Sequence, residues 1–228
     1  MHTTKESLQV LFEDNHIIII NKRCGDIIQG DKTGDTPLSD IIKEYLKEKY
    51  KKPGNVFLGT VHRLDRPTSG IVIYAKTSKA LERLNKMFRD KKVFKTYWAI
   101  VRGQLNNKQN SLTNYLKKNQ KLNKSFVAKK EIAGSKKAVL HYCLLKKLHN
   151  YSLLEINLET GRHHQIRAQL SHINHPIKGD LKYGDKRSNG DGGISLHARK
   201  IEFIHPVSKE NIKIIAPPPN SHIWKSCV

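Results

Sequence analysis

The residues most able to do chemistry are an aspartate and its basic neighbours in the sequence HRLDRPTSG, residues 62–70. Arg63 and Arg66 flank Asp65 and would keep its carboxylate ionised at neutral pH, as a carboxylate nucleophile requires. Apolar runs on both sides predict strands, so this loop would be held by rigid elements. An ion pair that only stabilises the loop is the alternative for such an aspartate.

A second polar cluster lies in TGRHHQIR, residues 160–167. Gly161, Arg162, Gln165 and Arg167 frame a predicted turn, and the apolar spacing that follows predicts a helix. Two clusters of arginine and polar side chains, one with a carboxylate, are more than a random basic chain is expected to carry.

Four histidines, His163, His164, His172 and His175, lie close together and suggest a metal site. No HExxH motif or cysteine cluster accompanies them, so we predict no metal and interpret His164 as a hydrogen-bonding group. Neither GxGxxG nor GxxxxGK[ST] occurs, and we predict no cofactor.

Composition favours a nucleic-acid partner. The chain has 42 Lys+Arg against 20 Asp+Glu, a net charge of +22 over 228 residues, and 37% of it is hydrophobic, which is enough for a core. A merely solvated basic surface is the alternative. Three widely spaced cysteines, no leader-like N-terminus and no long apolar run predict a cytoplasmic protein that does not enter the membrane.

The elements that must position these residues are mainly strands. Strands are predicted over residues 16–22, 56–61, 71–76, 93–103, 138–147, 151–159, 194–204 and 211–215. Helices are predicted from a Thr36 cap to Tyr50, from a Ser78 cap to Asp90, and after the turn at 160–163, with the ordered pattern ending at Pro217–Pro219. The basic segment 104–137 is predicted to form exposed hairpins or loops, and 179–193 a loop.

These elements predict an α/β (α+β) fold: one domain, residues 1–228, built on a mixed, largely antiparallel β-sheet with flanking helices. The motif-bearing core spans about residues 10–217, and the basic insertion spans about 104–137.

The ordered motifs HRLDRPTSG, KTYWAIVRG, TGRHHQIR, HPIKGDLKYG and SLHARKIEFIHP resemble those of the RluA-type pseudouridine synthase family. The resemblance covers nearly the whole chain and implies the family fold and an isomerase that converts uridine in RNA to pseudouridine. It implies RNA, ribosomal or transfer, as the partner. We expect no S4-like domain before the first motif, so RNA affinity would come from the catalytic domain or the basic insertion.

The resemblance also implies site roles. Asp65 matches the essential aspartate, Tyr97 the tyrosine that stacks on the target base, and Arg167 the arginine that pairs with the aspartate. Arg63 matches an arginine that stabilises the flipped-out nucleotide. Substrate contacts are further expected from neighbouring motif residues: His62, Arg66, Lys95, Arg162, His164 and Gln165.

The chemistry requires cleavage of the glycosidic bond, rotation of the uracil and rejoining through carbon 5, with no redox step. The carboxylate could attack the anomeric carbon of the sugar or assist loss of the base, and the sequence does not decide between these two roles. It also does not identify the general base. A tyrosine face and arginine donors suit an extruded base.

Two other hypotheses are a non-catalytic RNA-binding or ribosome-assembly protein on the same fold and a base-excising glycosylase. We predict a monomer with no obligate protein partner.

Overall fold

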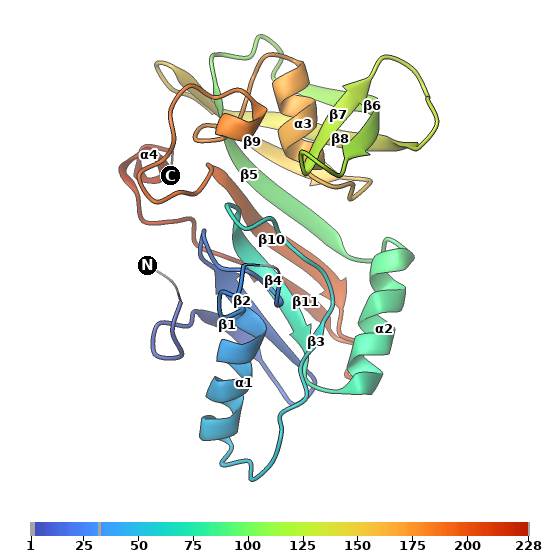
Figure 1. The fold of residues 1–228 in the computed structure, drawn as a ribbon, viewed down its shortest axis with the longest axis vertical. Coiled ribbons are helices and arrows are strands. Elements are labelled where there is room, and N and C mark those ends of the chain that lie inside the picture. Colours follow the sequence, from blue (N-terminus) through green and yellow to red (C-terminus); the bar gives the residue numbers. More distant parts are fainter. Residues whose placement is uncertain (1–2, 32, 228) are drawn as a thin grey trace. The chain divides into compact units, whose positions relative to one another are not determined.

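The computed structural model describes residues 3–31 and 33–227 (Figure 1). The chain divides into two compact units, which are described in turn. Unit 1 comprises the described residues up to Phe94 together with Ala198–Pro219, and unit 2 comprises Lys95–His197 and the described residues from Asn220 onward. Within the described residues no helix is both long and apolar enough to cross a membrane. The single-domain assignment stays a prediction.

Unit 1 has the strand order β1-β2-β4-β10, with β3 paired to β4 and β11 paired to β10. The pairs β1–β2, β2–β4, β3–β4 and β10–β11 are antiparallel. Its elements are β1 Val10–Glu13, β2 Ile17–Lys22, α1 Leu38–Lys49, β3 Gly59–Thr60, β4 Ser69–Ala75, α2 Ser78–Arg89, β10 Leu196–Ile204 and β11 Asn211–Ile215.

The core of unit 1 forms where α1 covers one face of β2 and β4. Both strands are buried along their whole length, as expected for a β-branched run without polar alternation. The side chains that meet there include Ile18, Ile20, Leu38, Ile42, Leu46, Val72 and Tyr74. This packing fixes the two ends of the HRLDRPTSG segment, because β3 precedes it and β4 begins inside it.

Gly70 explains the end of that motif. Its φ is +111°, and a Cβ at this position would lie 2.4 Å from the carbonyl oxygen of Ala198 on β10. Only glycine allows β4 and β10 to approach so closely in that backbone conformation.

Unit 2 has the antiparallel strand order β5-β9-β8-β6-β7. Its elements are β5 Phe94–Arg102, β6 Gln109–Asn119, β7 Lys124–Ala128, β8 Ser135–Lys147, β9 Tyr151–Leu158, α3 Gln165–His172, the 3₁₀ turn η1 Leu181–Tyr183, and α4 His222–Lys225. Helix α3 packs on the sheet through Ala168, which joins Leu116 and Ala138 in a buried cluster. The prediction of a largely antiparallel sheet with flanking helices is confirmed.

Three boundaries differ from the sequence-based expectation. Thr36 does not cap α1: the N-cap is Pro37, and the Leu38 N–H donates to the Ile27 carbonyl 2.8 Å away. For α2 the cap is Thr77, whose hydroxyl accepts from the Ala80 N–H, rather than Ser78. Between residues 56 and 61 only β3 is a strand. At the two helices, a distant backbone partner or a one-residue shift satisfied the N–H donors that a local rule had assigned elsewhere.

One segment confirms its prediction, and another contains more structure than predicted. Residues 104–137 form the paired strands β6 and β7, which confirms the hairpin interpretation. The ordered pattern does not end at Pro217–Pro219, because α4 follows and buries Trp224 against Ile100 and Leu153. A four-residue helix carries no periodic signal in the sequence, so the apolar contacts of its tryptophan are what hold it.

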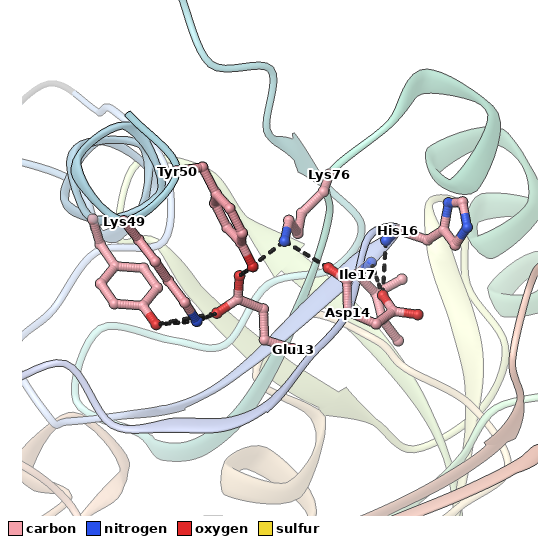
Figure 2. A network of polar contacts seen from close by, with 8 residues as sticks. Glu13, Asp14, His16, Ile17, Lys49, Tyr50 and Lys76 are labelled. Carbon is pink, nitrogen blue, oxygen red and sulfur yellow. Dashed lines mark hydrogen bonds and ion pairs between the residues drawn. The ribbon is translucent and has the colours of Figure 1, made fainter. Parts of the chain in front are cut away.

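A polar network ties β1 to α1 in unit 1 (Figure 2). The Glu13 carboxylate, 6% exposed, accepts hydrogen bonds from Lys49 at 2.7 Å, Lys76 at 2.8 Å and Tyr50 at 2.7 Å. Burial alone would raise the pKa of Glu13, but these donors outweigh burial and lower the pKa to about 2. The network therefore stabilises the folded state only while Glu13 is ionised.

We expect an acid-dependent loss of stability from this network. Because the folded pKa lies below the ordinary value of 4.5, the stabilisation is complete above that value and disappears as pH falls toward 2. Solvent screening around the half-exposed Lys49 limits the effect to about 1–2 kcal/mol. Denaturant unfolding of Glu13→Gln should show that loss at pH 7 and little difference from wild type at low pH. Glu48→Gln, which removes an exposed carboxylate paired with Lys5, is the matched control. Equal losses in both variants would contradict this prediction.

Candidate active site

The predicted site residues fall in both units. In unit 1 the loop that carries Asp65 is fixed through its backbone. The Thr68 N–H donates to the Asp65 carbonyl at 3.0 Å, and the Gly25 N–H donates to the Arg66 carbonyl at 2.9 Å. Asp65 itself is half-buried. These two main-chain contacts do not involve the Asp65 carboxyl group, so a change of that group leaves them in place.

His62 holds the start of this loop. Its Nε2 accepts from the Ile73 N–H of β4 at 3.1 Å, and its ring stacks on Phe88 of α2 with centroids 4.9 Å apart. An acceptor Nε2 defines the tautomer with the proton on Nδ1. The structure thus gives His62 an anchoring contact between β4 and α2, while its substrate contact stays a prediction.

Arg63 and Arg66 are both exposed. The guanidinium of Arg66 forms an ion pair with Asp35, Nη1 to Oδ2 at 2.7 Å, rather than with its sequence neighbour Asp65. Arg66 follows Asp65 in a turn closed by the Thr68 N–H and the Asp65 carbonyl, and its guanidinium pairs with a carboxylate 31 positions earlier in the chain. Arg63 is on the surface, where a contact with a nucleotide is sterically possible.

Lys22 is a polar group of this region that the sequence interpretation missed. It is 1% exposed, and its Nζ donates to the carbonyls of Arg23 at 2.8 Å and Arg66 at 3.1 Å. Burial lowers the pKa of Lys22 to about 8, while the negative charges of Asp26 and Asp65 act in the opposite direction. A buried ammonium thus adds positive potential at Asp65 and holds the next residue of its loop. The only signal was a lysine that ends a strand of four isoleucines and an asparagine.

Tyr97 lies in unit 2 on β5 and is 8% exposed. It pairs with Ile156 of β9, which pairs with Tyr142 of β8, and directly paired residues share one face of a sheet. Ala138, four residues from Tyr142 on β8, lies on the same face and packs against Ala168 of α3. Tyr97 therefore projects from the sheet face that α3 covers.

The TGRHHQIR loop lies close to Lys95: a Cβ built at Gly161 would be 4.0 Å from the Lys95 Nζ. Burial lowers the pKa of Lys95. Arg162 is exposed, and its Nε donates to the Lys137 carbonyl at 2.9 Å. Two cationic side chains therefore border the turn that begins α3, and their predicted substrate contacts remain predictions.

Gln165 has its side-chain amide engaged inside the protein. Oε1 accepts from the Thr160 hydroxyl at 2.8 Å and the Arg162 N–H at 2.9 Å, and Nε2 donates to the Val139 carbonyl at 3.1 Å. The side chain is 3% exposed. Its structural role is to close the turn before α3.

Arg167 is held by Asp180. Its Nε donates to Oδ2 at 2.6 Å and its Nη2 to Oδ1 at 2.8 Å, with the two side chains 5% and 1% exposed. Its guanidinium carbon lies 5.0 Å from the ring centroid of Tyr183. The bidentate pair fixes the plane of the guanidinium. Pairing of Arg167 with Asp65, which the sequence motifs imply, stays a prediction.

His164 occupies a left-handed backbone conformation, φ 52°, at the N-cap of α3. Its Nδ1 lies 3.0 Å from the Tyr183 hydroxyl. Burial, followed by the positive charge of Arg167, lowers the pKa of His164 to about 2, so its ring is neutral. This agrees with the interpretation of His164 as a hydrogen-bonding group. Among the residues that the structure describes, no group of three or more metal-ligating side chains is arranged to hold an ion.

Asp180 and Tyr183 were not predicted as site residues, although the motif HPIKGDLKYG contains both. Their segment is clamped again by Asp185, whose Oδ1 accepts from Arg102 Nε at 2.8 Å and Oδ2 from the Gly179 N–H at 2.7 Å. Two buried aspartates five positions apart, Asp180 and Asp185, are each paired with an arginine from another element and hold this loop against the sheet and α3.

The comparisons with known proteins agree on one class. Residues 16–172 match the family model described as RNA pseudouridylate synthase. A ribosomal large subunit pseudouridine synthase C of Buchnera aphidicola is 34% identical over 215 residues, which covers 91% of this chain and 66% of that protein. An uncharacterised RNA pseudouridine synthase of Synechocystis is 36% identical over 228 residues, which covers 97% of this chain and 68% of that protein. The chain spans about two thirds of the length of these curated relatives.

The fold is also found in solved structures. The human RNA pseudouridylate synthase domain containing 4 superposes with a TM-score of 0.78 at 22% identity, covering 95% of this chain and 90% of that one. The human RNA pseudouridylate synthase domain containing 1 superposes with a TM-score of 0.77 at 22% identity, covering 100% of this chain and 90% of that one. At this identity the likeness concerns the fold.

Proposed function

The chain belongs to the RNA pseudouridylate synthase family, a family of isomerases, and on that premise we propose that it converts selected uridines of ribosomal RNA to pseudouridine with Asp65 as its catalytic carboxylate. The observation that supports this most directly is the joint presence of Asp65, Tyr97 and Arg167 in a chain that matches the family over most of its length. Relatives named for the large ribosomal subunit favour ribosomal over transfer RNA.

The proposed division of roles follows the geometry of each unit. Asp65 acts on the sugar or assists loss of the base, on a loop whose backbone Lys22 and Gly25 hold. Tyr97 receives the uracil on its ring, and Arg63, being exposed, stabilises the extruded nucleotide. Gln165 and His62 act as positioning residues, because the side-chain amide of Gln165 and the Nε2 of His62 are bonded to the protein.

The reaction is tested by tritium release. RNA labelled with tritium at carbon 5 of uracil loses the label when that carbon is joined to the sugar. Release by the wild-type protein, with pseudouridine in the digested RNA, is the expected outcome. Free uracil would instead indicate a glycosylase, and tight binding without release would indicate a non-catalytic RNA-binding protein. Either result would refute the proposal.

Tyr97 is expected to contribute through its ring. Base stacking is worth about 1–3 kcal/mol per base, so Tyr97→Ala should lower kcat/KM by roughly 5- to 150-fold. Tyr97→Phe keeps the ring and the buried volume and is the matched control. Steady-state tritium release and a thermal unfolding curve for each variant are the measurements. If Phe and Ala reduced the rate equally, the hydroxyl and not the stacking surface would carry the effect.

We further propose that the protein acts in the cytoplasm as a monomer, with RNA as its only required partner. The absence of an obligate protein partner is tested by activity of the purified chain. A requirement for a second protein in the tritium assay would contradict it.

A further inference from the structure

Three lysines from different segments of unit 2 gather around the start of α3. They are Lys118 on β6, Lys124 on β7 and Lys182 in η1. Lys124 Nζ lies 4.9 Å from the ring centroid of Tyr183, and Lys182 Nζ donates to the Asn123 carbonyl at 3.3 Å. The pKa of His164 is lowered first by burial and then by the charges of Arg167 and His163. The charges of Lys182 and Lys118 lower it further, so these two ammonium groups also act at the His164 ring.

The positive charge of this lysine cluster, Lys118, Lys124 and Lys182, is not balanced by the protein. None of the three forms an ion pair with a carboxylate in the described part of the chain. Asp180, whose segment also carries Lys182, has both carboxylate oxygens bonded to Arg167. Like charges held close together repel, and an anion from outside the protein would relieve that repulsion.

The backbone beneath the lysine cluster is fixed before any ligand arrives. The Ser125 hydroxyl donates to the His163 carbonyl at 2.7 Å, and the Ser125 N–H donates to the Tyr183 hydroxyl at 2.8 Å. His163 stacks on His164 with centroids 3.8 Å apart, and its Nε2 lies 3.1 Å from Asn123 Oδ1. The β6–β7 hairpin, α3 and η1 are therefore joined at this point, and the site needs no ordering of its main chain to bind.

The side chains suit a phosphodiester backbone. Lys118 and Lys182 are exposed, and Lys124 is half-buried beside an aromatic ring. Flexible ammonium groups bind phosphates as point charges and carry no base specificity. We propose that Lys118, Lys124 and Lys182 form a docking site for successive phosphates of the substrate RNA. The identity of this polyanion as RNA rests on the proposed function.

The test compares two triple variants with the same change in charge, both in an Asp65→Asn background so that no turnover occurs. Lys118→Gln/Lys124→Gln/Lys182→Gln removes the lysine cluster. Lys108→Gln/Lys146→Gln/Lys147→Gln removes three exposed lysines at the other end of the β6–β8 pair, where the Leu144 N–H donates to the Lys108 carbonyl. The probe is a fluorescently labelled single-stranded RNA titrated at several salt concentrations.

We expect the cluster variant to bind roughly thirtyfold more weakly at about 0.15 M salt, with the slope of log affinity against log salt shallower by about 2, since three phosphates contribute about 0.7 each. The control variant should lose less than about threefold. Equal losses in the two variants would overturn the site and leave only the overall field of the basic chain. If thermal unfolding shows that the cluster variant is not folded, the exposed single changes Lys118→Gln and Lys182→Gln replace it, and affinities equal to that of the parent would overturn the site.

This experiment separates the docking site from the proposed function. The binding comparison uses no turnover, and tritium release by the wild-type chain tests the isomerase independently. Weaker binding of the cluster variant supports the site even where no tritium is released. Tritium release together with equal binding of the two triple variants rejects the site and keeps the isomerase.

Discussion

Replacing Asp65 with asparagine removes tritium release from RNA labelled at carbon 5 of uracil, with turnover falling on the order of 10³-fold or more. Asparagine matches aspartate in size but carries no negative charge, so it cannot act as the carboxylate that the chemistry requires. The loop should keep its shape, because its anchors are the main-chain contacts of Asp65, Arg66 and Thr68 and the ammonium of Lys22.

The control for this change is Asp35→Asn, which neutralises an exposed acid that pairs with Arg66 of the same loop. We expect it to keep most of the activity, since exposed ion pairs contribute about 0–1 kcal/mol. RNA affinity and the unfolding midpoint of Asp65→Asn should stay near those of the wild type. Retention of a tenth of the turnover or more would remove Asp65 from the catalytic role.

The second large effect is expected at Asp180. Asp180→Asn removes the buried carboxylate to which Nε and Nη2 of Arg167 donate, and breaking a buried ion pair in this way costs about 3–5 kcal/mol. The free energy of unfolding, measured by denaturant titration, should fall by that amount. Glu202→Gln, which breaks a partly exposed pair with Lys200 at 2.9 Å, should cost less than about 1 kcal/mol.

A double variant distinguishes stability from function at this pair. Arg167→Met/Asp180→Leu removes both charges, and apolar side chains of similar volume should recover much of the stability that Asp180→Asn loses. The double variant should nevertheless release no tritium, because Met offers no hydrogen-bond donor in place of the Arg167 guanidinium. Recovered activity would show that the Arg167–Asp180 pair serves the fold alone.

Local patterns in the sequence were enough for most elements and for the family. The isoleucine run of β2 and the β-branched run of β4 predict buried strands because side-chain branching and apolar character are properties of the residues themselves. The motifs around Asp65, Tyr97 and Arg167 predicted the family in the same way, since their residue types and order along the chain need no coordinates. Helix caps were misplaced by one residue: at α2 the neighbouring hydroxyl of Thr77 is the acceptor, and at α1 the Leu38 N–H is satisfied by the distant Ile27 carbonyl.

The tertiary structure decided which groups those residues meet. No local pattern indicates that Arg167 is held by Asp180, thirteen positions away, or that Arg66 pairs with Asp35. The same is true of Lys22, which is buried against a loop 44 positions later in the chain. Trp224 lies beyond the predicted end of the ordered pattern at Pro217–Pro219, and it is buried because it packs with Ile100 and Leu153, which are distant in the sequence. Residue type and spacing determine propensity and possible chemistry, whereas charge pairing and burial depend on distances that exist only after separate segments have packed together.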